Sequence, residues 1–140
     1  MNDADRKRVE RELAVKVLGA TVIDECVARE DMPLPRRLPQ IAWFRQASTW
    51  VVYEGPTDAY RRFAPTTNLP NAWDLLGRLV EKSLERGHAV DVRVHRGGNE
   101  VELSLMDAHG HAAAMELAAA LCVAMCGVLR IDTKGEKNEP

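Results

Sequence analysis

Residues 63–87, FAPTTNLPNAWDLLGRLVEKSLERG, carry the clearest structural signal in this 140-residue chain. Apolar side chains recur there at the i, i+3, i+4, i+7 spacing of one helical face, which predicts a helix from Leu69 to Arg86 that ends at Gly87. The predicted apolar face consists of Leu69, Ala72, Trp73, Leu76, Leu79, Val80 and Leu84. Ordering this backbone costs about 1–2 kcal/mol per residue, more than its large side chains contribute at about 1.5–3 kcal/mol each. The helix therefore needs another element to pack against.

The segment after Gly87 supplies the predicted packing partner. Apolar and polar residues alternate on both sides of the turn at residues 96–99, RGGN, which is the pattern of a β-hairpin. The apolar positions are Val90, Val92, Val94, Val101, Leu103 and Leu105. The other face is polar, with Asp91, Arg93 and Glu102, so we expect an antiparallel pair that is packed on one side. Trp73 and the helix stripe are expected to lie against Val92 and its neighbours.

The rest of the chain predicts further helices and strands. Val9, Leu13 and Val17 mark a first helix that ends at Gly19, and a short strand is expected at Thr21–Asp24. Residues 25–40 contain three prolines with Arg36 and Arg37 between them, which predicts an extended loop. Residues 41–44 and 49–54 form a second hairpin, residues 107–111 a loop, and residues 112–126 an alanine-rich helix stopped by Gly127. The tryptophans, Trp43, Trp50 and Trp73, are expected to anchor the core.

The predicted order is α-β-β-α-β-β-α. We expect residues 1–131 to form a single α+β domain, in which a mostly antiparallel sheet of four to five strands packs with three helices. Residues 132–140, DTKGEKNEP, are expected to be a disordered tail.

Composition argues against a nucleic-acid or membrane partner. The chain is 46% hydrophobic and 29% charged with a net charge of −2, so no overall basic field attracts nucleic acid. The N-terminus has no apolar signal segment, and three cysteines, Cys26, Cys122 and Cys126, indicate free thiols in a reducing compartment. The apolar run 112–129 is long enough to span a membrane, but Glu116 and the many small residues favour a buried helix. We therefore expect a cytoplasmic protein without a membrane or nucleic-acid partner.

Three motifs together resemble the phage ABA sandwich domain family of small phage and prophage proteins. They are ELAVKVLG (residues 12–19), FAPTTNLPNAWDLLGRL (63–79) and AAALCVAMCG (118–127). The middle motif is also similar, more distantly, to that of NinX-type phage proteins. The resemblance implies a layered sandwich with helices on both sides of the sheet, and the proline-rich segment 25–40 departs from the family pattern as an insertion. The family supplies no established chemistry to transfer to particular residues.

The residues before the central helix have two interpretations. Thr66, Thr67 and Asn68 are residue types that cap a helix start, and Pro70 fits at the first helical turn. The same N-terminus could instead bind phosphate or carboxylate. Arg61 and Arg62 would then add positive charge, and Tyr60 could stack on a base. The cap is the favoured interpretation, and the six residues Tyr60, Arg61, Arg62, Thr66, Thr67 and Asn68 are the candidate ligand site.

Other chemistry-bearing residues favour structural roles. Residues 107–111, DAHGH, could supply metal ligands but are also typical of a turn, which we favour. Cys122 and Cys126 are four residues apart in an apolar helix and are expected to be small core residues. No catalytic motif is present, so we predict no enzyme activity, no cofactor and no metal site.

The sequence predicts a small, non-enzymatic phage or prophage accessory protein in the cytoplasm of a bacterial host. It would bind a host protein or a second copy of itself, with its sheet edge or its proline-rich loop covering the partner's surface. The alternative is a protein that sequesters an anionic, nucleotide-derived small molecule at the helix start Thr66–Asn68. An enzyme that uses residues 107–111 is the third hypothesis.

Overall fold

The computed structural model of the protein describes residues 1–26, 39–55, 60–95, 97 and 99–133. Its helices are α1 (Asp3–Leu13), which continues as the π-helical segment η1 (Ala14–Leu18), α2 (Leu69–Glu85) and α3 (Leu117–Leu129). Its strands are β1 (Thr21–Cys26), β2 (Gln40–Phe44), β3 (Thr49–Tyr53), β4 (Tyr60–Phe63), β5 (Asp91–His95), β6 (Glu100–Leu105) and β7 (Ala108–Ala113). The predicted α+β class is confirmed. The predicted proline-rich loop and C-terminal tail fall largely outside the described residues.

The strands form two sheets, where the sequence predicted one. The first has the order β1-β2-β3-β4, with β1 parallel to β2 and the other pairs antiparallel. The second has the order β5-β6-β7 and is antiparallel throughout. β4 and β7 were missed by the sequence prediction. Residues 108–111 were expected to form part of a loop, but they pair with β6, because a neighbouring strand can impose extended structure on a weakly β-prone segment.

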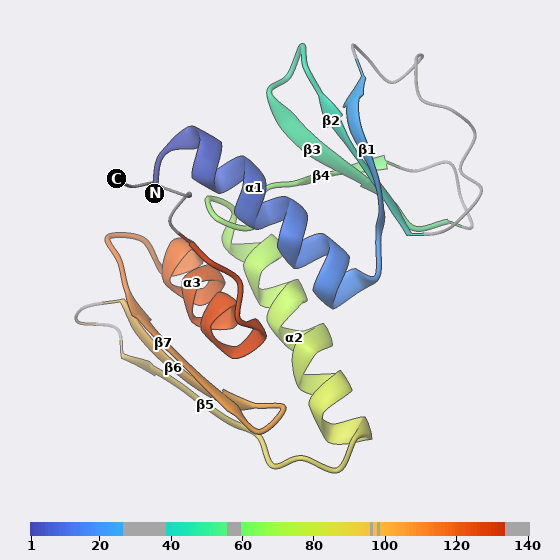
Figure 1. Ribbon diagram of the computed structural model, residues 1–140. Coiled ribbons are helices and arrows are strands. Elements are labelled where there is room, and N and C mark those ends of the chain that lie inside the picture. Colours follow the sequence, from blue (N-terminus) through green and yellow to red (C-terminus); the bar gives the residue numbers. More distant parts are fainter. Residues whose placement is uncertain (27–38, 56–59, 96, 98, 134–140) are drawn as a thin grey trace, which may run out of the picture.

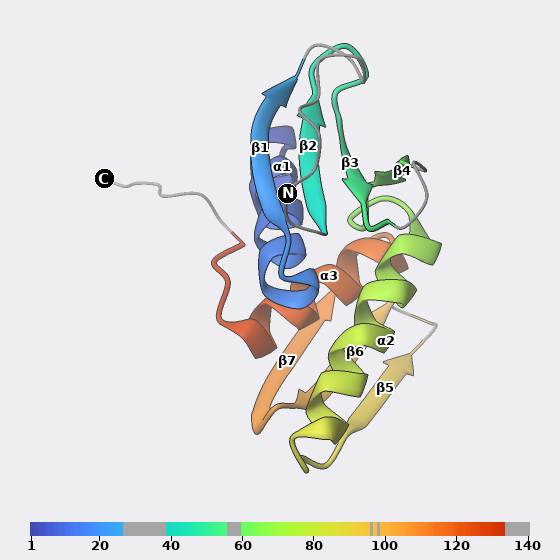
Figure 2. The same cartoon turned by 90° about the vertical axis from the view of Figure 1, so that its right-hand side faces the viewer.

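The helices lie between the two sheets (Figure 1). α1 runs along the β1–β4 sheet, and α3 covers one face of the β5–β7 sheet. In the view of Figure 2, α3 lies between the two sheets and α2 passes in front of the second one. The layers are thus ordered sheet, helices, sheet, whereas the resemblance implied helices on both sides of a sheet. In the described part of the chain, no helix is long and apolar enough to cross a membrane.

The first helix follows the sequence prediction closely. Val9, Leu13 and Val17 are buried, and the helix ends at Gly19, whose φ of 68° is the left-handed conformation that glycine adopts without strain. The hairpin of β2 and β3 also forms as expected, with Trp43 opposite Trp50. Of the three tryptophans, Trp50 is fully buried and Trp43 is half-buried, so the prediction that all three anchor the core fails at Trp73.

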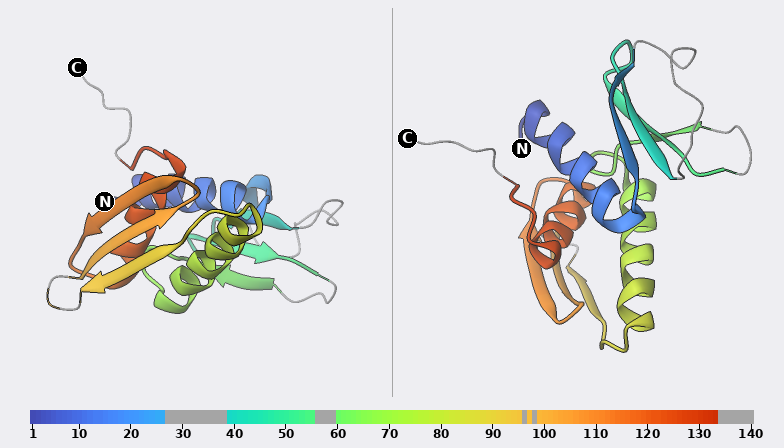
Figure 3. Two further views of the ribbon diagram at one scale, coloured as in Figure 1. Left: turned by 90° about the horizontal axis from the view of Figure 1, so that it is seen from below. Right: turned by 45° about the vertical axis from the view of Figure 1, so that its right-hand side comes forward.

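The expected packing of α2 on the valine-rich hairpin is wrong. Trp73 is 41% exposed and Val92 is 36% exposed, so neither lies in a shared core. α2 instead buries a face turned slightly around the helix, with Leu75, Leu76 and Leu79, and packs against η1 and α3. The position over the hairpin belongs to α3, which packs on β6 and β7. Both views of Figure 3 place β5 at the margin of its sheet, on the side of α2.

The small residues of α3 explain why it takes this position. A Cβ placed on Gly110 of β7 would lie 1.8 Å from the carbonyl oxygen of Ala124, and one on Gly127 would lie 3.0 Å from the Cα of Gly110. The helix and the sheet therefore touch through backbone atoms. Gly127 serves this contact and does not end the helix, which continues to Leu129 and closes at Arg130 with a φ of 60°. The expected helix start at Ala112 is also wrong, because residues 108–113 belong to β7.

The backbone contact between β7 and α3 predicts a large effect of one methyl group. We expect Gly110→Ala to lower the free energy of unfolding by about 3 kcal/mol, because the new Cβ would overlap the carbonyl group of Ala124 and α3 would have to move away from the sheet. Gly77→Ala in α2 is the matched control. Nothing lies within 4 Å of its new Cβ, so it should raise stability by about 0.5–1 kcal/mol. Urea unfolding of both variants measures the difference, and a Gly110→Ala variant as stable as the wild type would contradict the contact.

Candidate anion-binding pocket

A pocket of about 420 Å³ opens between α1, the turn that joins β2 to β3, and the segment that leads into α2. It is lined by Asp3, Ala4, Arg6, Lys7, Glu10, Trp43, Ser48, Thr49, Arg62, Ala64, Thr66 and Thr67. Three of these are cations, two are carboxylates and five carry a hydroxyl group or an indole. The pocket therefore has a polar, net positive lining with one aromatic wall.

One face of α1 forms the charged wall. Asp3, Arg6, Lys7 and Glu10 follow the i, i+3, i+4, i+7 spacing, while Val9 and Leu13 on the other side are buried in the core. The helix begins at Asn2, whose side-chain oxygen accepts a hydrogen bond of 2.8 Å from the Asp5 N–H. The cap fixes where the first turn starts and so fixes the positions of Arg6 and Lys7.

Two tryptophans hold the aromatic wall. Trp50 is buried, and its indole N–H donates a 2.9 Å hydrogen bond to the carbonyl oxygen of Lys7. Trp43 meets Trp50 edge to face, with ring centroids 5.3 Å apart. The Lys7 ammonium lies 4.3 Å from the centroid of the Trp43 ring, which is a cation–π contact. This chain of contacts places a positive charge at a defined point on the pocket wall.

A buried carboxylate joins α1 to the segment before α2. Glu10 is 6% exposed, and its carboxylate accepts hydrogen bonds from the hydroxyl of Thr66 at 2.8 Å and from the Thr66 backbone N–H at 3.2 Å. Burial raises the pKa of Glu10, and the two bonds from Thr66 together with the charges of Arg6 and Arg62 oppose that increase. The side chain thus holds the pocket floor and carries less negative charge as the pH falls toward its raised pKa.

Only some of the predicted ligand-site residues line the pocket. Arg62, Thr66 and Thr67 line the pocket, and the Nε of Arg62 lies 3.5 Å from the Thr49 hydroxyl. Thr66 is tied to Glu10 and does not cap the helix, while the Thr67 hydroxyl donates to the Ala64 carbonyl at 3.4 Å. The side chain of Tyr60 lies outside the described residues. Half of the predicted set therefore meets in one place, beside α1 and not at the start of α2.

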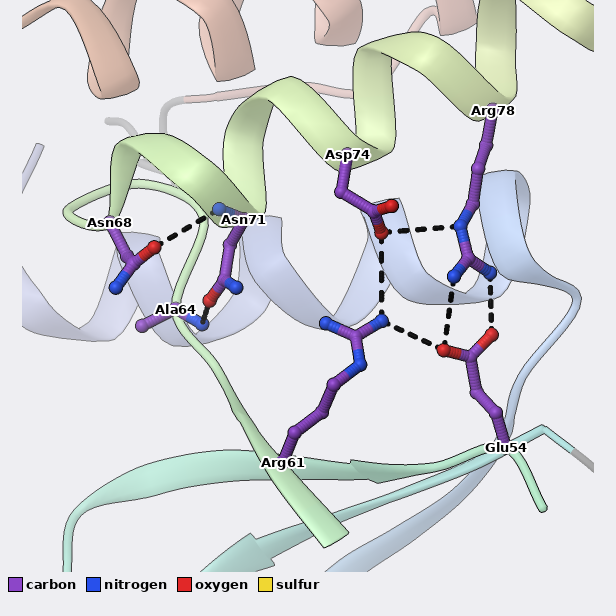
Figure 4. Close-up of polar contacts among 7 residues, drawn as sticks. All are labelled: Glu54, Arg61, Ala64, Asn68, Asn71, Asp74 and Arg78. Atoms are coloured by element: carbon purple, nitrogen blue, oxygen red, sulfur yellow. Dashed lines mark hydrogen bonds and ion pairs between the residues drawn. The ribbon is translucent and has the colours of Figure 1, made fainter. Parts of the chain in front are cut away.

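Asn68 is the cap of α2. Its side-chain oxygen accepts from the Asn71 N–H at 3.0 Å, and the Asn71 side chain in turn accepts from the Ala64 N–H at 2.9 Å (Figure 4). The two amides satisfy donors on both sides of the helix start, much as a capping box does. Since these N–H groups already have acceptors, the helix terminus is not the part of this region that is open to an anion.

Arg61 points away from the pocket into a cluster of four charges. Its guanidinium lies 2.8 Å from Glu54 and 3.5 Å from Asp74, and Arg78 contacts the same two carboxylates (Figure 4). Arg61 lies in this cluster and Arg62 lines the pocket because neighbouring residues of a strand point to opposite faces. Hydrogen bonds from Arg78 and Arg61 lower the pKa of Glu54, and they outweigh its partial burial. The cluster ties the edge of the first sheet to α2.

None of the remaining candidate residues lines the pocket. His109 and His111 are on the outer, polar face of β7, where His111 contacts Glu100, and Asp107 lies 3.1 Å from His88. Among the described side chains, no three of His, Cys, Asp or Glu are grouped closely enough to hold a metal ion. Cys122 and Cys126 are buried in the core, and burial raises the pKa of both thiols, that of Cys126 to about 12.

Sequence reasoning missed four residues that shape the pocket: Arg6, Lys7, Glu10 and Trp43. No role was predicted for the polar residues of α1, and Trp43 was assigned to the core. The i, i+3, i+4, i+7 spacing of Asp3, Arg6, Lys7 and Glu10 shows that they share a face. What that face contacts depends on residues about fifty positions away, which local patterns do not reveal.

No family model, no curated protein and no solved structure matches this chain. The resemblance to the phage ABA sandwich domain family therefore stays a prediction from the three motifs that suggested it.

The charge cluster around Glu54 predicts a pH-dependent contribution to stability. We expect Glu54→Gln to lower the free energy of unfolding by about 1 kcal/mol at pH 7, because two arginines lose a shared partner in a partly exposed network. The folded-state pKa of Glu54 lies below its ordinary value of 4.5, so its contribution is present above pH 4.5 and is lost as the pH falls through the lowered pKa.

Urea unfolding of wild type and variant between pH 7 and pH 3 checks this. The two curves should converge at the acid end. Glu85→Gln, at the exposed last residue of α2, is the control and should leave stability unchanged. A constant difference between wild type and Glu54→Gln across the pH range would show that the loss is not electrostatic.

Proposed function

We propose that the protein binds a small anionic, nucleotide-derived ligand in the pocket between α1 and the segment before α2. One observation carries the proposal: cations from two distant parts of the chain, Arg6 and Lys7 of α1 and Arg62 of β4, converge on one pocket of about 420 Å³. That volume is within the range of small-molecule sites, which combine an apolar or aromatic wall with a few placed polar groups.

The pocket charges favour an anion. Three cations against two carboxylates leave one net positive charge, and Asp3 is fully exposed at the rim, 3.8 Å from Arg6. The planar guanidinium of Arg62 suits two oxygens of a phosphate or carboxylate, and Lys7 supplies a point charge beside it. The hydroxyls of Thr49 and Thr67 are further polar groups within the pocket.

The aromatic wall favours a ligand that also has a flat, apolar part. Trp43 is half-buried and fixed against Trp50, so little side-chain entropy remains to be lost when a ring packs on it. Because the Lys7 ammonium lies over the Trp43 ring, the charged end of the ligand would sit near Lys7 and the ring along the exposed part of the indole. This combination is the reason for preferring a nucleotide-like ligand over a bare inorganic anion.

The proposed role is binding and sequestration. The geometry that supports it is a set of fixed hydrogen-bond donors and charges around a cavity. In that role the predicted phage or prophage accessory protein would remove a small signalling or metabolic anion from solution. The phage context rests on the sequence resemblance, and the ligand class rests on the pocket.

A thermal-unfolding screen tests the ligand class. Nucleoside mono-, di- and triphosphates and cyclic nucleotides should raise Tm, whereas the matching uncharged nucleosides should not, because a ligand that binds the native state stabilises it. Arg62→Ala should weaken binding about 10-fold or more, the loss expected for a charge-assisted hydrogen bond. Arg61→Ala is the matched control, since Arg61 lies in the Glu54 cluster, and it should bind as the wild type does.

Glu10 gives the same experiment a pH arm. Its carboxylate repels an anion when ionised and does so less when protonated, and burial raises its pKa. Binding should therefore be stronger at a pH near the raised pKa of Glu10 than at pH 8, and Glu10→Gln should flatten that dependence. No Tm shift with any anion at either pH, or equal effects of the two arginine variants, would contradict the proposal.

A second candidate is binding to a protein, and a different surface favours it. Trp73 is 41% exposed and Leu84 is 58% exposed, and with Gly77 and Val80 they follow one side of α2. Exposed large apolar side chains in a row are typical of interaction sites. The predicted partner is a host protein or a second copy of this chain.

A pull-down from host lysate with Trp73→Ala and Leu84→Ala variants tests this candidate. A specific partner that uses the stripe should be captured by the wild type and lost from the variants, while anion binding stays intact. Equal capture by wild type and variants would rule out this surface as the docking site.

A further inference from the structure

β5 is an edge strand that is poorly covered. In the described part of the chain, β6 is its only neighbour in the sheet, and all five of its residues are exposed or half-buried. Val92, on the apolar side of the strand, is 36% exposed because α3 packs mainly on β6 and β7. An uncovered edge presents unpaired backbone N–H and C=O groups that can pair with another strand.

The side chains from Val90, the residue before β5, to Val94 are arranged symmetrically about Val92. In an antiparallel pairing with a second copy and the two-fold axis at Val92, Asp91 of each copy lies opposite Arg93 of the other. Val90 then lies opposite Val94, and the two Val92 side chains face each other. Asp91 and Arg93 of each copy therefore both face an opposite charge, which is the self-complementarity that a two-fold interface requires.

Alternative registers are less favourable. Centring the axis on Asp91 places the two Asp91 carboxylates opposite each other, and centring it on Arg93 places the two guanidinium groups together. Shifting the register by one residue sets the valine side of one copy against the polar side of the other. The Val92-centred register is therefore the one that avoids like charges and keeps the valines on one face.

The local geometry already suits this register. Arg93 lies 3.1 Å from Asp91 on the polar face, and both side chains are more than half exposed. On pairing, the two ion pairs of the two copies would meet as a group of four alternating charges. Charges on an edge strand usually prevent pairing with arbitrary strands, but this arrangement repels other strands and accepts its own copy.

We propose that β5 pairs antiparallel with β5 of a second copy, which joins the two β5–β7 sheets into one continuous sheet. The proposal deepens the protein-binding candidate by naming a second copy of this chain as a partner. It uses neither the pocket nor the Trp73–Leu84 side of α2, so it stands or fails independently of anion binding and of capture of a host protein.

Sedimentation and light scattering across a concentration series give the first test. The wild type should show a reversible monomer–dimer equilibrium, whereas a monomer at every concentration would overturn the proposal. Asp91→Arg and Arg93→Asp should each weaken self-association about 10-fold or more, because each converts both attractive pairs into repulsive ones. The double variant should restore it.

A mixture of the two single variants gives the most specific test of the register. In the Val92-centred register, the Asp91→Arg and Arg93→Asp chains complement each other, so a one-to-one mixture should form a heterodimer although neither chain dimerises alone. A mixture that stays monomeric, or dimers that ignore both substitutions, would overturn the register. Anion binding by all of these variants should equal that of the wild type.

A cross-link keeps the test valid if a charge variant folds poorly. The paired Val92 positions lie directly opposite, within the reach of a disulfide, so Val92→Cys should give a covalent dimer on mild oxidation. Glu102→Cys, on the central strand of the same sheet, is the matched control and should remain monomeric. Equal cross-linking at both positions would show random collision and count against the interface.

Discussion

The backbone contact between Gly110 of β7 and the Ala124–Gly127 turn of α3 sets the spacing of the layers. Because no side chain separates the helix from the sheet there, α3 lies closer to the strands than a leucine-rich helix could. α2 is left to pack against α3 and η1, and only partly reaches the second sheet. The exposure of Trp73 on one side and of Val92 on the other follows from this arrangement. Both candidate protein-binding surfaces are thus consequences of one close approach.

The bond between Glu10 and Thr66 has a similar role in the other half of the molecule. It joins residues 56 positions apart and holds the segment before α2 against α1. A carboxylate that is buried at this cost needs its hydrogen bonds, because an unpaired one would destabilise the fold by several kcal/mol. The pocket is the space left beside this bond, lined by the exposed side of α1. Its cations lie in the same pocket as a carboxylate whose charge depends on pH, so the proposed anion binding would itself depend on pH.

Much of the fold could be predicted from the sequence, and the errors have identifiable physical causes. Periodicity located α1, α2 and both hairpins, and Gly19 marked a helix end correctly. Periodicity alone could not show which side of α2 faces the core, since Trp73 and Leu75 lie at the margins of two overlapping apolar faces. Nor could it show that Gly127 serves a helix–sheet contact, because glycine at a helix end and glycine at a close contact look alike in sequence. At the pocket, Arg62, Thr66 and Thr67 were found because they lie near a recognisable helix start. Lys7 and Trp43 were missed because their meeting with these residues depends on tertiary structure.

Apolar packing holds both sheets to the helical layer, because the core contains side chains of the first sheet as well, namely Ile41, Trp50, Val52 and Phe63. The β5–β7 sheet adds a backbone contact with α3, while Arg61 and the neighbouring Glu54 of the other sheet add ion pairs with Asp74 and Arg78 of α2. Dissolved salt screens the ion pairs and leaves the backbone contact in place. Ionic strength therefore acts unequally across the molecule. Concentrated salt weakens the ion pairs between β4 and α2, next to the pocket, more than it affects the attachment of the β5–β7 sheet.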